Sequence, residues 1–277
     1  MSKHKVALIV HSCDRYKLLY QGFNFFFSKY WVSNAAVKCY FATEEIPVNF
    51  KNFENIKSGK GQWSNRLSTL LDQIEEDYII YFQEDMWLSK AVDQSALSRL
   101  IELAIQNKWK QVKLNSSSVF STIKGETFLN GLNISKLDNE KSGFLMSHQV
   151  TLWNKEFLKK QLLPNEHPWR NERKGTKRLK KLNPEIYHID LFSENGNQAN
   201  NENDDSATSS AYSTISLNAT LNDKAPYFIE ALKKEGPLQE YAAQLQHNYN
   251  FQITHDGKPK PLKKDFFKRI KNWIKGK

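Results

Sequence analysis

The chain has 277 residues, which is enough for one large domain or for one domain with an appendage. Hydrophobic residues make up 39% of it and aromatic residues 13%, which excludes an intrinsically disordered chain, and no apolar window is long enough to cross a bilayer. The net charge of +10 favours an anionic partner, which could be a nucleotide, a nucleic acid or a lipid surface.

The first residues and the cysteines indicate a compartment. A short basic start precedes an apolar run that lacks the small residues of a signal-peptide cleavage site, so we expect a cytoplasmic protein. The two cysteines, Cys13 and Cys39, agree with a reducing compartment. No Cys and His spacing predicts a zinc site.

The first predicted unit is a strand, a polar loop and a helix. Residues 6–10 form an apolar run typical of a buried strand, and residues 16–31 carry a dense aromatic face that predicts a helix packed on a sheet. The loop between them contains no glycine and no Gly-x-Gly-x-x-Gly or Walker-type pattern, which argues against dinucleotide-binding and P-loop chemistry. Residues 37–42 predict the next strand.

A basic loop follows at residues 57–67. It places Lys60 and Arg66 ahead of, or in the first turns of, a helix that runs to about Glu76, and Ser64 is the expected N-cap. Because the free amides at a helix N-terminus attract anions, a phosphate site is one interpretation of this loop. A solvated basic loop is the other.

The stretch 77–88 organises the rest of the chain. Residues 78–82 are β-branched or aromatic without alternation, which predicts a strand buried on both faces of a parallel sheet, and the run stops just before Glu84 and Asp85. In an open α/β sheet the ligand lies beyond the carboxyl ends of the strands. A carboxylate there can hold a divalent cation, and the cation can hold a diphosphate. The alternative is a pair of solvated acids in a turn.

The second half of the chain continues the alternation of strands and helices. The patterns predict a helix at 95–109, a strand at 111–114, loops at 115–142 that would frame a substrate, and a strand at 143–152. A helix is predicted from 153, followed by an irregular loop at 164–172 that two prolines enforce. Glu172 then opens another helix, and a strand is predicted at 186–192. Residues 193–213 are rich in Asn, Ser, Asp and Glu and predict a linker or mobile loop, after which residues 227–246 predict a helical piece.

The last residues form a basic amphipathic pattern. In 263–275 the aromatic and aliphatic residues share one helical face and lysines take the other, which favours contact with an anionic membrane surface. The alternative is that this segment docks on the body of the protein.

The order of these pieces resembles the bacterial glycosyltransferases of the GT-A fold that build lipopolysaccharide or capsule from nucleotide-diphosphate sugars. The likeness covers residues 5–192. It implies an α/β fold with a Rossmann-like, mostly parallel central sheet flanked by helices, and a small C-terminal helical extension. The implied organisation is a nucleotide-sugar-binding and catalytic domain at 1–192, a polar linker or mobile loop at 193–225, and an extension at 226–277 that ends in the basic amphipathic helix.

The resemblance also assigns a metal site. The family has an Asp-x-Asp after the central strand, whose last acid usually holds the metal, and here these positions read Gln83, Glu84 and Asp85. Asp85 therefore inherits the binding of Mn²⁺ or Mg²⁺ and Glu84 lies beside the donor, while the first acid is missing. Members of the wider fold that work without metal neutralise the departing diphosphate with basic side chains, and the candidates here are Lys60, Arg66, Arg170 and Arg173.

A Trp-Gly-x-Glu-Asp-like segment supplies the catalytic base in inverting members of the family. Trp169 to Glu172 lie in the corresponding place, so the resemblance makes Glu172 the carboxylate that deprotonates the acceptor hydroxyl. Its alternative role is to cap a helix or to pair with Arg173 or Lys174. The reserve candidates are Glu166, His167 and Asp190.

By the same resemblance, other residues meet the donor or the acceptor. Ser12, Asp14 and Arg15 would contact the nucleotide base and ribose, although Asp14 could equally cap the next helix. Ser147, His148 and Gln149 would touch a sugar. Trp153 and Trp169 offer faces on which a pyranose could stack, and each could equally belong to the core.

The implied activity is transfer of a sugar, with UDP-sugar as the expected donor, to a cell-envelope glycan or glycolipid, with inversion at the anomeric carbon. The enzyme would work in the cytoplasm or on the inner face of the cytoplasmic membrane. Two alternatives are a nucleotidyltransferase of similar fold, which normally has a glycine-rich loop near its first strand, and a basic nucleic-acid-binding module. Against the latter, the basic residues cluster in the tail and at 170–181, and no nucleic-acid-binding motif is present, so we expect no nucleic-acid partner.

Overall fold

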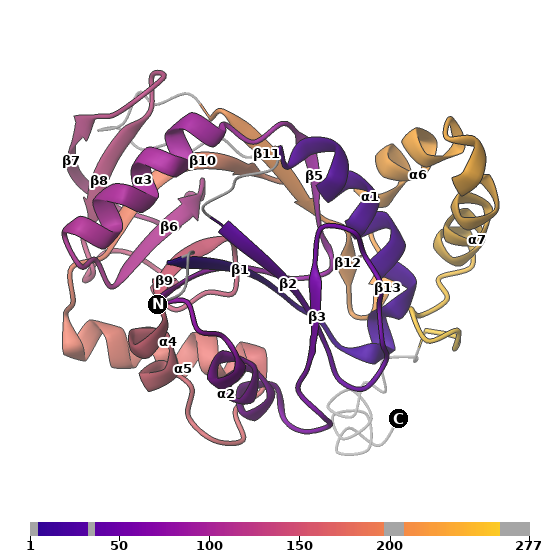
Figure 1. Cartoon of the computed structure of the whole chain (residues 1–277), viewed down its shortest axis with the longest axis horizontal. Helices are drawn as coiled ribbons and strands as arrows, with labels where there is room; N and C mark the ends of the chain where they lie inside the picture. The colour runs from indigo at the N-terminus through magenta and orange to yellow at the C-terminus, as the bar shows by residue number, and fades with distance from the viewer. Residues whose placement is uncertain (1–4, 33–36, 197–207, 261–277) are drawn as a thin grey trace, which may run out of the picture. The chain divides into compact units, whose positions relative to one another are not determined.

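The computed structural model describes residues 5–32, 37–196 and 208–260, and it divides the chain into two compact units, residues 1–215 and 216–277 (Figure 1). The basic amphipathic helix predicted at 263–275 lies outside the described residues. Among the described helices, none combines the length and the apolar character needed to cross a bilayer.

The first unit is built on a mixed, mainly parallel sheet. Its strands follow the order β3-β2-β1-β4-β9-β6-β10-β11-β5, and the β7-β8 hairpin joins it through β10. Strands β3, β2, β1 and β4 run parallel to one another, as do β6, β10 and β11, whereas β9, β5 and β8 are antiparallel to their neighbours in the sheet. The bounds are β1 Val6–His11, β2 Val37–Thr43, β3 Glu54–Lys57, β4 Tyr78–Phe82, β5 Met86–Lys90, β6 Gln111–Asn115, β7 Thr122–Thr127, β8 Asn133–Leu137, β9 Thr151–Asn154, β10 Tyr187–Glu194 and β11 Ser210–Thr214.

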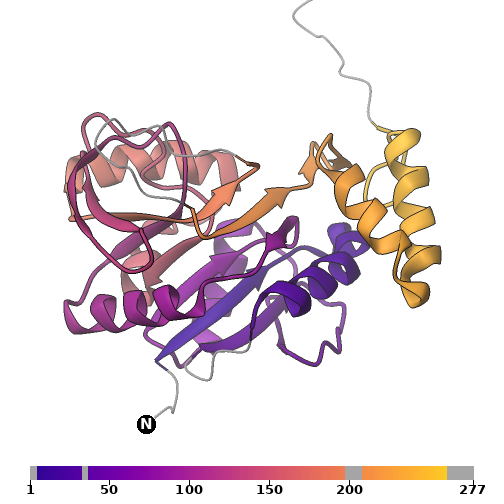
Figure 2. The ribbon, with the colours of Figure 1, turned by 90° about the horizontal axis from the view of Figure 1, so that it is seen from above.

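Helices cover both faces of this sheet (Figure 2). On one face α1 packs the rings of Phe23 and Phe27 against Phe82 of β4. On the other face, side chains of α2, α4 and α5 form a cluster with Ile79 and Tyr81 of the same strand. The helices are η1 Asp14–Leu19, α1 Tyr20–Tyr30, α2 Trp63–Gln73, α3 Gln94–Gln106, α4 Lys155–Gln161 and α5 Pro168–Leu182.

The predicted α/β class with a mainly parallel central sheet flanked by helices is confirmed. Strands β1, β2, β4 and β6 lie within two residues of their predicted bounds, and every residue of β4 is buried. This agreement has a physical reason, because a strand covered on both faces must be apolar throughout, and such a run is unambiguous in a sequence.

Several predicted bounds of helices and strands were wrong, because polar residues or proline belong to the helices and strands at these places. The helix expected at 16–31 is divided into η1 and α1. The strand expected at 143–152 is limited to β9, and the helix expected from Trp153 begins at Lys155 because Asn154 caps it by accepting from the Phe157 N–H. Strand β3 and the β7-β8 hairpin were not predicted.

The starts of α2 and α5 also differ from the prediction. Gln62 is the N-cap residue of α2, whereas Ser64 lies inside the helix. Helix α5 begins at Pro168, so Glu172 lies in its second turn rather than at its start. Proline is favourable at the first position of a helix because no intrahelical partner exists there for its missing N–H, and His167 caps this end by accepting from the Arg170 N–H at 3.3 Å.

The stretch 193–225, assigned to a linker by composition, contains regular structure in its described part. Strand β11 lies between β10 and β5 and buries Tyr212 completely. Its serine and threonine residues resemble linker composition, but strand neighbours on both sides pair their backbone groups.

The second unit begins with a hairpin formed by β12 Ser216–Leu217 and β13 Thr220–Leu221. Its turn residues Asn218 and Ala219 have φ angles of 53° and 63°, as a two-residue hairpin turn of the primed type requires. The single helical piece predicted at 227–246 is realised as α6 Ala225–Lys233, the short η2 Gly236–Leu238 and α7 Gln239–Asn250, because Pro237 interrupts the continuous helix.

Gly22 in α1 is a position at which packing outweighs helix propensity. A Cβ atom there would lie 2.1 Å from the ring of Trp87 in β5, a fully buried side chain. Gly22→Ala is therefore expected to destabilise the protein, since overpacking typically costs about 1 to 3 kcal/mol and exceeds the gain of roughly 1 kcal/mol in helix propensity. Denaturant unfolding measures this change, with Gly236→Ala as the control because its Cβ would meet open space. An unchanged or higher midpoint for Gly22→Ala would contradict the packing argument.

Candidate functional site

Polar side chains gather at one edge of the sheet in the first unit. Strands β1, β4, β6 and β10 all run in the same direction, so their carboxyl ends meet at this edge, and the antiparallel β9 begins there. The residues that lie at or just past these ends include His11, Ser12, Glu84, Asp85, Asn115, Gln149 and Glu194. Ligand sites of open α/β sheets form at this position.

Glu84 and Asp85 occupy the turn between β4 and β5. Glu84 is buried, its carboxyl group accepts from the backbone N–H of Cys13, and its carbonyl oxygen accepts from the Trp87 indole at 3.0 Å. Asp85 is half-buried, and its carbonyl oxygen accepts from the Ile215 N–H at 3.0 Å. The turn is therefore held by β1 and by the end of β11, which rules out a pair of fully solvated acids.

Burial disturbs the ionisation of both acids. It raises the pKa of the Asp85 carboxyl to about 7. It also raises the pKa of Glu84 well above the ordinary value, and the charge of Asp85 adds to this rise. Burial, followed by the charge of Glu84, raises the pKa of Tyr16 to about 12. The pair is thus a site of poorly compensated negative charge, which is a property of functional sites.

This donor set fits a divalent cation only if the ligand contributes to its coordination. Among the described residues, no group of three or more His, Cys, Asp or Glu side chains could hold a metal ion by itself. Mg²⁺ and similar hard cations are, however, bound by one or two carboxylates together with the phosphate oxygens of a substrate. Asp85, with Glu84 beside it, offers that number and kind of ligand.

Arg66 and Asp14 connect the loop after β1 with the loop after β2. Arg66 is buried; its guanidinium donates to the Ser12 carbonyl oxygen and to Ser58 Oγ at 3.1 Å, and it lies 3.3 Å from Glu44 Oε1. The carboxylate of Asp14 accepts from the N–H groups of Glu44, Glu45 and Ile46 at 2.9 to 3.0 Å. Both charged groups thus have a structural role in shaping this edge of the site.

The other residues predicted to meet the nucleotide differ in exposure. Ser12 is buried, with its hydroxyl 2.6 Å from the Ala42 carbonyl oxygen and 2.9 Å from the Tyr20 hydroxyl. Arg15 is exposed. Lys60 is also exposed and pairs with Glu45 at 2.9 Å. A ligand at this edge could reach Arg15 and Lys60 without breaking interior hydrogen bonds.

A second acidic group lies around Lys113, a fully buried lysine of β6. Its ammonium group donates to Ser147 Oγ at 2.7 Å. Burial lowers the pKa of Lys113 to about 7, against the charges of Glu172 and Glu194, which raise it. Burial also raises the pKa of both of these acids.

Glu172 and Glu194 are each fixed by one hydrogen bond. Glu172 Oε1 accepts from the backbone N–H of His148 at 3.0 Å, and Glu194 Oε2 accepts from the Asn115 side chain at 2.9 Å. Glu172 does not cap α5, and among the described residues it forms no ion pair with Arg173 or Lys174. Its charge acts on the ammonium group of Lys113, whose pKa it raises.

Tyr212 connects the two acidic groups. Its hydroxyl donates to Gln149 Oε1 at 2.8 Å. Burial raises its pKa well above the ordinary value, and the charges of Glu194 and Asp85 add to this rise. One buried tyrosine thus lies within electrostatic range of both acidic groups.

Neutral rings line the sheet beside these acids. His11 Nδ1 lies 3.2 Å from the Tyr81 hydroxyl, and the rings of Trp63 and His148 are 4.1 Å apart. Burial lowers the pKa of His148 to about 3, and it lowers that of His11 well below the ordinary value. Both imidazoles are therefore neutral at pH 7.

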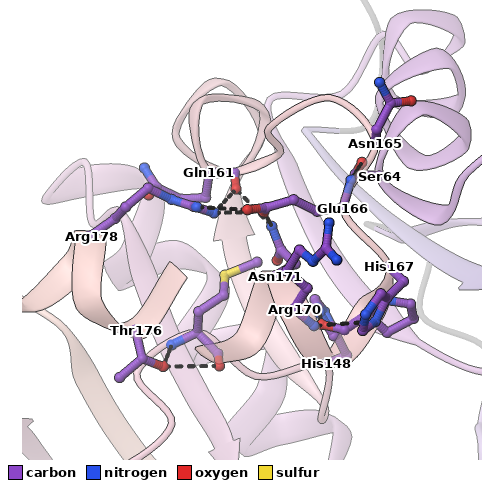
Figure 3. Close-up of polar contacts among 12 residues, drawn as sticks. Ser64, His148, Gln161, Asn165, Glu166, His167, Arg170, Asn171, Thr176 and Arg178 are labelled. Atoms are coloured by element: carbon purple, nitrogen blue, oxygen red, sulfur yellow. Dashed lines mark hydrogen bonds and ion pairs between the residues drawn. The ribbon is translucent and has the colours of Figure 1, made fainter. Parts of the chain in front are cut away.

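Glu166 fastens the loop before α5 to α2 (Figure 3). Its carboxylate accepts from Asn171 at 2.8 Å and from two nitrogens of Arg178 at 3.0 and 3.1 Å, and its N–H donates to Ser64 Oγ at 3.0 Å. Burial raises the pKa of Glu166, but the hydrogen bonds from Arg178 and Asn171 lower it below the ordinary value. These contacts give Glu166 a structural role.

The remaining candidates lie apart from one another. His167 caps α5, and Asp190 lies 3.3 Å from His188 Nε2 in the buried middle of β10. Trp153 is buried in the core, whereas Trp169 is exposed at the start of α5. Lys113, Asn115, Glu194 and Tyr212 were not predicted as site residues; the available signal was the position of Asn115 and Glu194 at the ends of predicted strands.

The fold and this polar edge define an α/β protein with a mainly parallel sheet and a candidate site at the carboxyl ends of its strands. No protein-family model and no curated protein matches the sequence. Among solved structures, the chain is similar to S. aureus TarS 1–349 in complex with UDP-GlcNAc, with 13% identity over 90% of this chain and 73% of that one and a TM-score of 0.49.

Two further solved structures are similar at the same level. The mannosyltransferase PcManGT from Pyrobaculum calidifontis, in complex with GDP-Man and Mn²⁺, shares 6% identity over 89% of this chain and 69% of that one, with a TM-score of 0.48. S. aureus TarS itself shares 12% identity over 90% of this chain, with a TM-score of 0.46. The chain spans 44% of the length of that TarS structure.

Proposed function

We propose that this protein is a glycosyltransferase that moves a sugar from a nucleoside-diphosphate donor to a hydroxyl group of a glycan. The observation that carries the proposal is the collection of Glu84, Asp85, Glu172 and Glu194 at the carboxyl edge of one sheet, each with a pKa raised by burial. Acids with raised pKa values at the ligand edge of an α/β sheet are typical of an active site. Two separate acidic groups suit a reaction in which one group stabilises the leaving group through a bound cation and the other accepts a proton.

The pair after β4 is the donor side of the proposed site. Asp85, with Glu84 beside it, would hold Mn²⁺ or Mg²⁺ together with the diphosphate, and the cation would neutralise charge on the departing nucleotide. The exposed cations Arg15 and Lys60 are the proposed direct contacts to the nucleotide. Ser12, Asp14 and Arg66 support the loop that receives it, since their polar groups have partners within the protein.

Glu172 is the proposed base on the acceptor side. It accepts the proton of the acceptor hydroxyl while that oxygen attacks the anomeric carbon, and the bond from this carbon to the diphosphate breaks with its electron pair on the leaving oxygen. Attack from the side opposite to the leaving group inverts the anomeric configuration. Gln149 and the exposed ring of Trp169 are proposed contacts to sugar rings.

The finer assignments rest on the sequence resemblance described above. We propose UDP as the nucleotide, a cell-envelope glycan or glycolipid of lipopolysaccharide or capsule type as the acceptor, and action in the cytoplasm or on the inner face of its membrane. The segment 263–275 remains a proposed membrane contact, and residues 1–192 remain the proposed centre of donor binding and catalysis.

Nucleotide binding tests the proposal directly. Calorimetry with a panel of nucleoside diphosphates, each with and without Mn²⁺ or Mg²⁺, is expected to show one preferred nucleotide whose affinity rises about tenfold or more with metal, because bound cation and diphosphate stabilise each other. Asp85→Asn is the control, in which this gain should vanish. Failure of all nucleotides to bind at millimolar concentration, together with salt-dependent binding of RNA or DNA, would favour the nucleic-acid alternative.

A further inference from the structure

Helix α5 has two faces of different chemistry. Its inner face buries Asn171, Gly175 and Leu179 and holds Glu172 against the His148 N–H. Its outer face carries five exposed cations, which we name the α5 basic stripe: Arg170, Arg173, Lys174, Lys177 and Lys181. The spacings of three and four residues place these side chains on one side of the helix.

Among the residues that the structure describes, no side chain of the α5 basic stripe forms an ion pair, although the charge of Lys174 acts on Glu166, which is paired with Arg178. Several other surface cations do pair with acids, as in Lys38 with Glu54 at 2.8 Å and Lys159 with Asp72 at 2.5 Å. Like charges three or four residues apart weaken a helix by about 0.2 to 0.5 kcal/mol per pair. A stripe that costs stability and forms no ion pair with the described residues favours an anionic partner from outside the chain.

Exposed apolar residues flank the stripe. Trp169 at its start is 66% exposed and Leu163 in the preceding loop 43%, whereas Leu182, 57% exposed, follows the buried Leu179 by three positions and lies on the inner side of the helix. Tryptophan and leucine beside lysine and arginine are characteristic of helices that lie at the surface of a membrane, since the apolar groups enter the headgroup region while the cations meet lipid phosphates. A soluble polyanion would bind the cations but would make no favourable contact with the exposed apolar side chains of Trp169 and Leu163.

We propose that the outer face of α5, through the α5 basic stripe with Trp169 and the neighbouring Leu163, binds the anionic surface of a phospholipid membrane. The surface is distinct from the segment 263–275 and lies wholly within the described residues. If the proposed function is correct, this orientation has a consequence for the substrate. Because Glu172 is on the opposite face of the same helix, docking would place it about one helix diameter, roughly 10 Å, from the membrane surface, where a lipid-linked acceptor is available.

Vesicle binding by the full chain tests the proposal without any need for activity. Vesicles of phosphatidylcholine with phosphatidylglycerol are compared with vesicles of phosphatidylcholine alone, and the variant Lys174→Gln, Lys177→Gln, Lys181→Gln is compared with wild type. Since each lysine near an anionic surface contributes about a fivefold gain in binding, the triple variant is expected to bind anionic vesicles about a hundredfold more weakly. Binding of the wild type should fall with added salt.

The matched control removes three exposed lysines elsewhere, at Lys51, Lys90 and Lys108, and so changes the net charge equally. It is expected to retain most of the binding. Equal losses in both variants would show an effect of net charge alone, and no loss in the α5 variant would show that another segment binds; either result would overturn the proposal. Soluble heparin separates lipid from polyanion: a loss of heparin binding without a loss of vesicle binding would also overturn it.

A second variant tests the apolar contribution. Trp169→Ser with Leu163→Ser should weaken vesicle binding severalfold and leave heparin binding unchanged, whereas unchanged vesicle binding would contradict insertion of these residues. Vesicle binding that persists in a protein without transferase activity would refute the proposed function alone. Active enzyme that fails to bind vesicles would refute the membrane surface alone.

Discussion

Asp85→Asn is expected to abolish sugar transfer and, at the same time, to stabilise the protein at pH 8. Asparagine occupies the same space but cannot neutralise a cation or hold it against a diphosphate. Loss of such electrostatic stabilisation of a leaving group typically lowers turnover about a hundredfold to a thousandfold or more. Burial raises the pKa of Asp85 to about 7, so the ionised form is disfavoured in the fold and its removal relieves that cost.

The pH dependence of this stabilisation follows from the direction of the shift. The folded protein binds the Asp85 proton more tightly than the unfolded chain, whose aspartate pKa is near 4, so the contribution of Asp85 to the unfolding free energy falls as the pH rises between about 4 and 7. The advantage of Asp85→Asn should therefore be largest above pH 7 and disappear below pH 4. Denaturant unfolding at several pH values measures it.

Asp72→Asn is the control for Asp85→Asn. Asp72 is exposed and pairs with Lys159, so its replacement is expected to change stability by less than about 1 kcal/mol at any pH. A variant at Asp85 that retains wild-type turnover would remove the donor-side assignment. A variant that is less stable than wild type at pH 8 would show that the buried carboxylate has a compensating partner.

The centre of the fold was predictable because its chemistry is local. The run of residues 78–82 is rich in β-branched and aromatic residues, which predicts a strand covered on both faces, and a strand of this kind ends at the ligand edge of its sheet. Glu84 and Asp85 were therefore predicted as site residues from their position in the chain alone, and their role remains a proposal. Their burial and raised pKa values are tertiary properties, because they depend on packing of the β1 loop over the turn.

Other parts of the site could not be predicted because they depend on strand order. Lys113 lies in a predicted strand, but only the pairing of β6 with β9 and β10 buries it near Glu172 and Glu194. Tyr212 belongs to a stretch with linker composition and becomes part of the core through pairing of β11 with β10 and β5. A sequence pattern reports which faces of an element are apolar, but not which elements become neighbours.

Helix α5 shows how one boundary changes the interpretation of a site residue. With Glu172 at the start of a helix, capping was a reasonable alternative to catalysis. With Pro168 as the first residue and His167 as the cap, Glu172 is in the second turn and is held by the His148 N–H. The structure thus removes the capping role, and the catalytic role remains a proposal.

Glu172→Gln is expected to lower turnover about a thousandfold, within the range of about 10² to 10⁴ that a positioned general base contributes, and to leave nucleotide binding almost unchanged. Glutamine keeps an oxygen that can accept from the His148 N–H, so the local structure is preserved, but it cannot accept the proton of an acceptor hydroxyl. Burial raises the pKa of Glu172, so the wild-type rate should fall on acidification at a pH above that of an ordinary carboxylate. Steady-state rates across pH, paired with calorimetry, measure both effects.

Variants of two other acids, Glu194 and the exposed Glu156, test whether Glu172 is the base. Glu194 also lies near Lys113 and has a raised pKa, so among the described residues it is the alternative candidate for the base. If Glu194→Gln abolished turnover while Glu172→Gln retained it, Glu194 of β10 would be the base that accepts the proton, and Glu172 of α5 would not. Glu156→Gln, at an exposed position of α4, should change neither rate nor affinity. Because Lys113 stabilises the ionised form of either acid, Lys113→Met should move the acidic limb of the rate profile to higher pH whichever acid is the base.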